Sequence, residues 1–349
     1  MTTRFFDAAD VFPLEGGGRL EGVRVAYRTW GEPEAEATLI CHALTGSADA
    51  DDWWEGLFGP GKVFDPSRDY IVAVNVLGGC SGTTGPTSPR PGRLAPYGPD
   101  FPDVSIRDMV RLQSLLLDHL GVERLRLVIG GSMGGMQTLE WALMYPERVD
   151  AIVPIGVGAA QSPWAMGLSE AQRHAIVTDP WFRGGRYRKN RGPDNGLATA
   201  RMIAMCSYRS PENFATRFGR VEHEDGGFAV QSYVRHQGKK LVDRFDANTY
   251  LTLLDAMDGH DLGRGRGPTE AVLRHVQTPA LIVGISSDVL YPAAEVASLA
   301  EALGNADFAL LDEPHGHDTF LIETDHLNDL VVGWLRNVET VGARERTGG

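Results

Sequence analysis

The sequence predicts an α/β fold, in which a mostly parallel sheet has helices on both faces and a helical segment is inserted late in the chain. Short apolar runs rich in β-branched residues alternate with amphipathic segments along most of the sequence. A strand that is apolar along its whole length must be covered on both faces, which is typical of a parallel sheet. The alternation also favours right-handed crossover connections.

The apolar runs that we expect to form strands are each bounded by polar or turn-forming residues. None reaches the roughly 18 continuous apolar residues of a membrane span, and the N-terminus lacks the apolar core of a signal peptide. The expected strands are residues 22–30, 37–44, 69–77, 125–130, 149–156, 279–286 and 306–312.

The expected helices lie between these strands. In residues 105–121, Ile106, Met109 and Leu116 share one side, and Gly121 is a stop signal. A second helix should begin at Met133 and end at about residue 145, before a proline. The last helices are expected at residues 293–304 and 318–338.

The alternation breaks between residues 163 and 275. This stretch has helical spacing, is rich in Arg, Met and Gln, and contains no convincing buried strand. We therefore expect residues 1–162 and 276–349 to form the core and residues 163–275 to form a helical lid over the carboxyl ends of the strands.

Composition excludes several classes of partner. The formal net charge is −13, which disfavours nucleic acid or an anionic membrane surface. Cys41, Cys80 and Cys206 form no CxxC pair, so the sequence predicts neither a zinc site nor a disulfide framework. We expect a cytoplasmic protein with no metal and no bound cofactor.

A glycine-rich turn follows the strand at 125–130. Its sequence, Gly-Gly-Ser-Met-Gly at residues 130–134, matches G-x-S-x-G between a strand and a helix. In that context the motif is a nucleophile elbow, which predicts the α/β-hydrolase fold with Ser132 as nucleophile. The backbone N–H of Met133 would then stabilise an oxyanion. The alternative is a tight turn without chemistry.

A serine nucleophile needs a histidine base and a carboxylate that orients it. In α/β hydrolases the order along the chain is serine, acid, histidine. Asp288 follows the strand at 279–286 and is the preferred acid, whereas Asp255, Asp258 and Asp261 fall in the insertion.

The base is expected on the loop after the last strand. That loop offers His315 and His317, and the chain order favours His317, leaving His315 as a surface or structural residue. Asp318 would cap the following helix.

The second oxyanion donor should come from the loop after the strand at 37–44. The backbone N–H of Leu44 is the preferred donor and that of Ala43 is the alternative. His42, in the same loop, is interpreted as structural.

Several segments together resemble the homoserine O-acyltransferase family, and in particular its O-acetyltransferases. They are the elbow GGSMGGMQTLEWA, CHALTGSADADDWW, NVLGGCSGTTGPTSP and HGHDTFL. The resemblance extends over about residues 10 to 335 and is far more specific than G-x-S-x-G alone.

The resemblance implies a ping-pong transfer from acetyl-CoA through acyl-Ser132 to the γ-hydroxyl of L-homoserine, a reaction of methionine biosynthesis. It implies that Asp288 and His317 complete the triad. It also implies that Arg201 holds the carboxylate of the amino acid and Asp318 its amino group. From the residues alone, Arg201 is no better a candidate than Arg209, Arg217 or Arg220. Family members pair as homodimers through the lid.

Other functions remain possible for the same residues. The donor could be succinyl-CoA, or the acceptor could be L-serine. An esterase or deacetylase could use the same triad with water as acceptor. A non-catalytic binding module is disfavoured because it would not require Ser132, Asp288 and His317 together.

Overall fold

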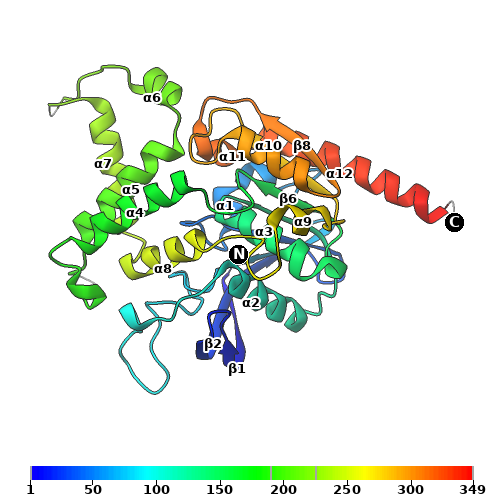
Figure 1. Cartoon of the computed structure of the whole chain (residues 1–349), viewed down its shortest axis with the longest axis horizontal. Helices are drawn as coiled ribbons and strands as arrows, with labels where there is room; N and C mark the ends of the chain where they lie inside the picture. Colours follow the sequence, from blue (N-terminus) through cyan, green and yellow to red (C-terminus); the bar gives the residue numbers. More distant parts are fainter. Residues whose placement is uncertain (1, 189–190, 225, 348–349) are drawn as a thin grey trace.

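The computed structural model describes residues 2–188, 191–224 and 226–347. These residues form one eight-stranded sheet in the order β1-β2-β4-β3-β5-β6-β7-β8 (Figure 1). From β4 to β8 all neighbours are parallel, whereas β1 and β2 pair antiparallel at one edge and β2 is antiparallel to β4. The mostly parallel sheet predicted from the sequence is therefore confirmed. The strands are β1 Arg4–Pro13, β2 Arg19–Trp30, β3 Glu36–Cys41, β4 Asp69–Val74, β5 Leu125–Gly131, β6 Ile152–Ile155, β7 Ala280–Ile285 and β8 Ala306–Leu311.

Each predicted strand is present, but β3 and β4 end three residues early. The residues that follow leave the sheet and bind one another: the backbone N–H of Val76 donates to His42 Nε2 over 3.1 Å, and that of Ala48 donates to Asn75 Oδ1 over 2.8 Å. The sequence did not predict β1, which lies at the sheet edge and exposes residues such as Phe5 and Val11.

Successive strand residues face two separate cores. Leu39 and Val128 pack into one core with the helices α2 Ile106–His119, α3 Met133–Met144 and α10 Ala293–Ala302. Their neighbours Ile40 and Ile129 pack into the other, with α1 Ala50–Trp53 and α12 Thr324–Thr347. This is the two-sided burial that continuous apolar strands require.

The N-terminus of α2 is fixed by a reciprocal capping box. Ser105 Oγ accepts the backbone N–H of Asp108 over 3.1 Å, and Asp108 Oδ2 accepts that of Ser105 over 2.9 Å. These bonds satisfy two donors that a helix start leaves unpaired.

The single helix predicted at 318–338 is wrong. The chain instead forms a 3-10 turn at Gly316–Asp318, α11 at Thr319–Ile322 and then α12, with a break at Glu323. The indole of Trp54 donates to the carbonyl of Phe320 over 2.8 Å. A continuous helix would use that carbonyl for its own ladder, so this contact favours the break.

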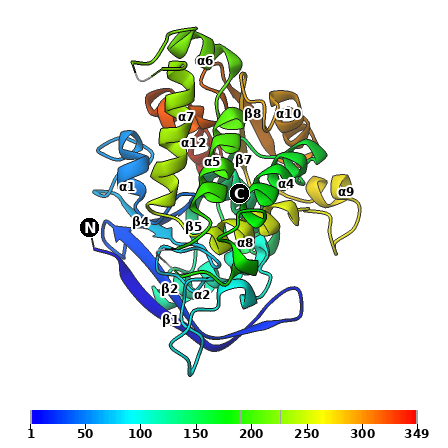
Figure 2. The same ribbon diagram turned by 90° about the vertical axis from the view of Figure 1, so that its left-hand side faces the viewer.

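Between β6 and β7 the chain forms a block of helices, which we call the helical block (residues 163–275). Its helices between residues 163 and 258 are drawn in green to yellow-green on one side of the sheet in Figure 1, and Figure 2 views them from that side. The short helix at residues 269–274 lies apart from them, near α3. The helix α12 projects away at the opposite end. No helix among the described residues is long and apolar enough to cross a membrane. The block comprises α4 Pro163–Val177, α5 Asp194–Tyr208, α6 Pro211–Phe218, α7 Ala229–Val242, α8 Ala247–Asp258 and α9 Thr269–Arg274.

The helical block contacts the loops that follow β7 and β8. The indole of Trp164 donates to the carbonyl of Val289 over 2.7 Å, and the Ser210 hydroxyl donates to the carbonyl of Pro314. These loops carry Asp288 and His317, so the block lies beside the candidate site.

Candidate active site

The turn between β5 and α3 holds Ser132 in a strained backbone conformation. Its φ is 58° and its ψ is −123°. This backbone conformation is energetically unfavourable for any residue other than glycine. The backbone N–H of Ser132 donates to the carbonyl of Ile155 over 2.9 Å, which fixes the turn to β6. Ser132 is 6% exposed.

Glycines flank the serine because β3 passes very close. A Cβ at Gly130 would lie 2.6 Å from the carbonyl oxygen of Cys41, and one at Gly134 would lie 2.1 Å from it. Both distances are shorter than real Cβ contacts, so these positions exclude any side chain. The glycines of the motif thus allow the strand, the turn and the helix to pack together.

Asp288 and His317 form a buried pair at the carboxyl edge of the sheet. His317 Nδ1 and Asp288 Oδ2 are 2.6 Å apart, and both side chains are nearly inaccessible. The other carboxylate oxygen, Oδ1, accepts the backbone N–H groups of Leu290 and Tyr291 over 2.8 and 3.0 Å. These bonds orient the carboxylate, which in turn orients the imidazole.

Opposing effects act on the pKa of His317. Burial by itself would lower the pKa, but the charge and the hydrogen bond of Asp288 outweigh it, so the net shift is upward. The ring is thereby prepared to accept a proton.

The second ring nitrogen of His317, Nε2, is buried and has no hydrogen-bond partner among the described residues. The ring lies against the backbone of Gly156, where an added Cβ would be 3.2 Å from Cε1 of His317. Gly156 directly follows β6, whose Ile155 holds the turn of Ser132. The structure therefore brings the serine and the histidine to the same strand end. No direct hydrogen bond joins their side chains in the described structure, and such bonds often tighten only when substrate is bound.

The predicted oxyanion donors lie on adjacent elements. Met133 is the first residue of α3, where helix geometry leaves the N–H without an intrahelical partner. Leu44 is buried just beyond β3, and its N–H likewise has no acceptor in the part of the chain that the structure describes. Both N–H groups are thus available for a developing negative charge.

The loop that carries Leu44 is fixed by His42. The Nδ1 atom of His42 lies 2.8 Å from the carbonyl of Ala43, and Nε2 accepts the N–H of Val76. Burial lowers the pKa of His42 to about 4, so the ring stays neutral. These contacts support the interpretation of His42 as structural.

Asp318 does not cap α11, contrary to the prediction. Its side chain makes no capping bond and instead forms an ion pair with Arg209, with 3.3 Å between Oδ2 and Nη2. Burial raises the pKa of Asp318, while the charges of Arg209, Arg201 and His317 act in the opposite direction. Asp318 and His317 thus share one buried charged environment.

Arg201 lies in the same environment, on α5. Its guanidinium stacks 5.3 Å from the ring centre of Tyr208, and its Nη1 is buried without a hydrogen-bond partner in the described structure. A buried, unpaired guanidinium nitrogen is costly unless a ligand satisfies it. Arg244 is close by, since burial and the charge of Arg201 both lower the pKa of Arg244. No pattern in the sequence indicated Arg244 as a site residue.

The other sequence candidates have structural partners. Asp255 and Asp258 bind Arg173 over 2.8 and 2.7 Å, and Asp261 accepts the N–H of Gly263. Two remaining arginines stack on aromatic rings of the helical block. The guanidinium carbon of Arg217 lies 4.5 Å from the ring centre of Tyr233, and that of Arg220 lies 5.0 Å from the ring centre of Phe228.

A small pocket adjoins the loop that carries His42 and Leu44. It lies between that loop, the glycine-rich loop after β4 and helix α8. Burial raises the pKa of the Cys80 thiol in its wall, so this cysteine is a poor nucleophile. The lining residues are His42, Leu44, Gly46, Asn75, Val76, Gly79, Cys80, Ser81, Phe245 and Leu253.

Comparison with known proteins shows which family and which solved structures this chain resembles. A family model described as the alpha/beta hydrolase fold matches residues 37–324. A homoserine O-acetyltransferase from Nostoc punctiforme is 55% identical over 337 residues, covering 94% of this chain and 95% of that protein. The crystal structure of esterase E22 has a TM-score of 0.88 at 27% identity, covering 96% of this chain and 99% of its own. A homoserine O-acetyltransferase from Bacillus anthracis has a TM-score of 0.89 at 23% identity, with 96% and 97% covered, and so supports the fold.

Proposed function

The chain belongs to the homoserine O-acetyltransferase family within the α/β-hydrolase fold, and from this membership we propose that it transfers the acetyl group of acetyl-CoA to L-homoserine. The observation that carries the acyl chemistry is the buried Asp288–His317 pair beside the elbow of Ser132. The near full-length likeness to the Nostoc protein carries the choice of donor and acceptor.

In the first half-reaction, Ser132 attacks the thioester carbonyl of acetyl-CoA. His317 Nε2 takes the proton of the serine hydroxyl as the new C–O bond forms. The N–H groups of Leu44 and Met133 stabilise the oxyanion. The carbon–sulfur bond then breaks, the CoA sulfur leaves with the proton from His317, and Ser132 carries the acetyl group.

In the second half-reaction, the γ-hydroxyl of L-homoserine attacks acetyl-Ser132. His317 removes the hydroxyl proton, and returns it to Ser132 Oγ as the acyl-enzyme bond breaks. O-acetyl-L-homoserine is released. Asp288 stabilises the imidazolium in both halves, which agrees with the raised pKa of His317.

We assign recognition of the amino acid to Arg201 and Asp318. The unpaired Nη1 of Arg201 offers a donor to the carboxylate of homoserine. Asp318 would accept the ammonium group. Burial raises the pKa of Asp318, and the charge of its present partner, Arg209, opposes that shift and favours the charged carboxylate.

Transfer to an alcohol requires that water be kept away from acetyl-Ser132. The burial of Ser132, Asp288 and His317 supports this. We propose that the helical block (residues 163–275) is the lid over a core formed by residues 1–162 and 276–349. The contacts of Trp164 and Ser210 with the loops after β7 and β8 support the assignment.

We also propose that two copies pair through this lid in the cytoplasm. Large apolar side chains are exposed on the block, among them Trp164 at 58%, Trp181 at 43% and Val221 at 62%. Such exposure is typical of an interaction surface when the side chains form one patch. Sedimentation of the purified chain would give its oligomeric state.

A panel that crosses acetyl-CoA and succinyl-CoA with L-homoserine and L-serine tests the proposal. Release of free CoA should be fastest with acetyl-CoA and L-homoserine together and slow with acetyl-CoA alone. Equal release with and without an acceptor would indicate a hydrolase, like esterase E22, and would overturn the proposed transfer. A preference for succinyl-CoA or L-serine would revise the donor or the acceptor.

A further inference from the structure

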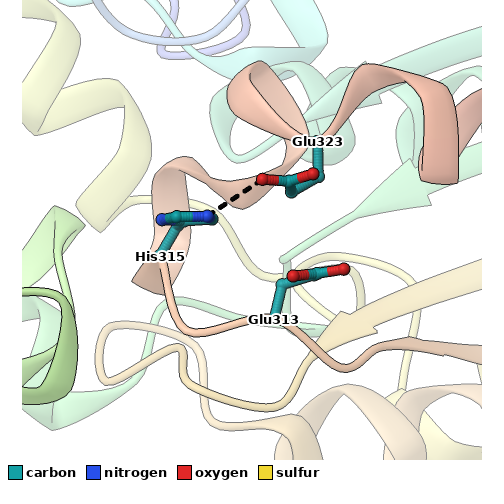
Figure 3. Close-up of side chains that lie close together, drawn as sticks. All are labelled: Glu313, His315 and Glu323. Carbon is teal, nitrogen blue, oxygen red and sulfur yellow. Dashed lines mark ion pairs between the residues drawn. The ribbon is translucent and has the colours of Figure 1, made fainter.

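A cluster of acidic and imidazole side chains lies beside the loop of His317, outside the acyl-transfer site. The potential ligand atoms of Glu313, His315 and Glu323 all lie within 4.8 Å of one another. His315 Nε2 is 2.9 Å from Glu323 Oε1, and Figure 3 shows the His315 ring facing that carboxylate, with Glu313 on the same loop as His315. His326 Nδ1 lies 3.2 Å from Glu313 Oε1. The acyl transfer described above uses none of these groups.

The charges in this cluster are unbalanced. The ion-pair partners of Glu313 and Glu323 within the described ranges are the imidazoles of His326 and His315, and neither carboxylate pairs there with a lysine or arginine. All four side chains are partly exposed, so an ion from solvent can reach them. Two carboxylates and a nearby imidazole are a donor set that suits a divalent cation.

The surroundings of His315 favour a metal-binding orientation of its ring. On the side away from Glu323, Nδ1 of His315 lies 2.9 Å from the amide nitrogen of Asn213, whose Oδ1 is buried without a partner. A half-turn of this amide would bring Oδ1 to Nδ1, which would then carry the proton and donate it. Nε2 would be left as a free lone pair facing Glu323. Metal-binding histidines usually donate their second N–H in this way.

We propose that Glu313, His315 and Glu323 bind a divalent transition-metal ion of the zinc type, with water in the remaining position. Zinc binds imidazole nitrogen and carboxylate oxygen at about 2.0–2.2 Å, and ligand atoms at that distance around one tetrahedral ion lie roughly 3.4 Å apart. Nε2 of His315 and Oε1 of Glu323, which are 2.9 Å apart, would therefore separate slightly to admit the ion, and the carboxylate of Glu313 would move to complete the set. Ca²⁺ and Mg²⁺ prefer all-oxygen sets and fit less well. His326 holds Glu313 in place, as Asn213 holds His315. The cysteine spacing could not have indicated such a site.

The proposed metal ligands lie on both sides of His317, the candidate base, in the sequence. Glu313 and His315 precede His317, and Glu323 follows it at the break between α11 and α12. Ser287 Oγ also ties this loop, donating to the carbonyl of Glu313 over 2.5 Å and accepting the N–H of Gly316 over 2.9 Å. A bound ion would join both ends of the loop and, through Asn213 on α6, stiffen its contact with the helical block.

Titration of Zn²⁺ into the metal-stripped full-length protein, followed by calorimetry, tests the proposal. We expect one saturable site per chain, and a Tm that rises with Zn²⁺ concentration because the ion binds only the folded state. Co²⁺ should give visible absorption bands from the same site. Absence of saturable binding would overturn the proposal.

Variants locate the site. His315→Ala and Glu323→Gln should each weaken Zn²⁺ binding more than tenfold, whereas His275→Ala, a histidine at the end of α9, should leave it unchanged. Asn213→Ala keeps every ligand and should weaken binding by about tenfold through the lost orientation of His315. If His315→Ala does not fold, the affinity of Asn213→Ala for Zn²⁺ tests the role of His315 in its place. Affinity unaltered by Glu323→Gln and Asn213→Ala would contradict the assignment, and this binding readout is independent of acyl transfer.

Discussion

The helices α3 and α5 contribute to the same candidate site but are built differently. On α3, residues 133–142 are all buried, and Gly134 lies against the backbone at the end of β3. On α5, buried and exposed residues alternate, and Arg201 keeps a buried nitrogen without a partner. The core thus holds the proposed nucleophile, Ser132, by close packing, whereas the helical block holds polar groups that a substrate can satisfy. Substitutions in the two regions should therefore have different kinds of effect.

The largest effect is expected for Ser132→Ala. Acetyl transfer should fall by about 10⁶-fold, the scale seen when a triad nucleophile is removed. The Tm should change little, because the side chain makes no hydrogen bond in the described structure. The steady-state rate of CoA release and a thermal melt measure these. Substantial residual transfer would mean that another group carries the acetyl.

A pair of glycine substitutions compares the close packing of α3 with an open position on α4, another helix of the helical block. Gly134→Ala places a Cβ 2.1 Å from the carbonyl oxygen of Cys41 and should lower the free energy of unfolding by about 1–3 kcal/mol or more. Gly167→Ala, on α4, meets no atom within 4 Å and should be neutral or stabilise by up to about 1 kcal/mol. Urea unfolding of both variants measures the difference. Equal effects would show that the two helices are not packed as described.

Arg201→Lys probes the recognition side. The charge remains but the planar fork is lost, so KM for L-homoserine should rise about 10- to 100-fold. Acetylation of the enzyme by acetyl-CoA alone should keep its rate. Arg217→Lys is a matched control on the same block, since Arg217 stacks on Tyr233, and should behave as the parent protein. A slower acetylation step in Arg201→Lys would contradict the assigned role.

The smallest expected effect is a shift in pH dependence. His317 must be neutral to act as a base, so kcat/KM should rise with pH through its pKa. Asp288 raises that pKa, which places the midpoint above the ordinary value of about 6.5. In Asp288→Asn, burial acts without this opposition, and the midpoint of the residual activity should move to lower pH. A midpoint that stays fixed would show that Asp288 does not control the base.

The sequence predicted the core better than the edges of the molecule. The strands β3 to β7 were found because each is an apolar run with buried residues on both faces. The edge strand β8 was found from its apolar run, although most of its residues are partly or fully exposed. The edge strand β1 was missed because its exposed positions leave no continuous apolar signal. The break at Glu323 lies beside a hydrogen bond from Trp54, which is far away in sequence, so no local pattern could show this contact.

The candidate site divides in the same way. Motif and chain order were enough to propose Ser132, Asp288 and His317, and the structure places them at one end of the sheet. Local pattern misassigned Asp318 as a cap, because its ion pair with Arg209 comes from another segment. It also could not rank Arg201 above its neighbours, because what distinguishes Arg201 is a buried nitrogen without a partner.

The fate of the acetyl group on Ser132 tests the central claim most directly. The protein would be mixed with acetyl-CoA, and its intact mass and the modified peptide would be measured before and after L-homoserine is added. We predict that acetyl accumulates on Ser132, persists in buffer and is discharged rapidly by L-homoserine with formation of O-acetyl-L-homoserine. Loss of the acetyl group at the same rate in buffer alone, or its appearance at another residue, would contradict the account.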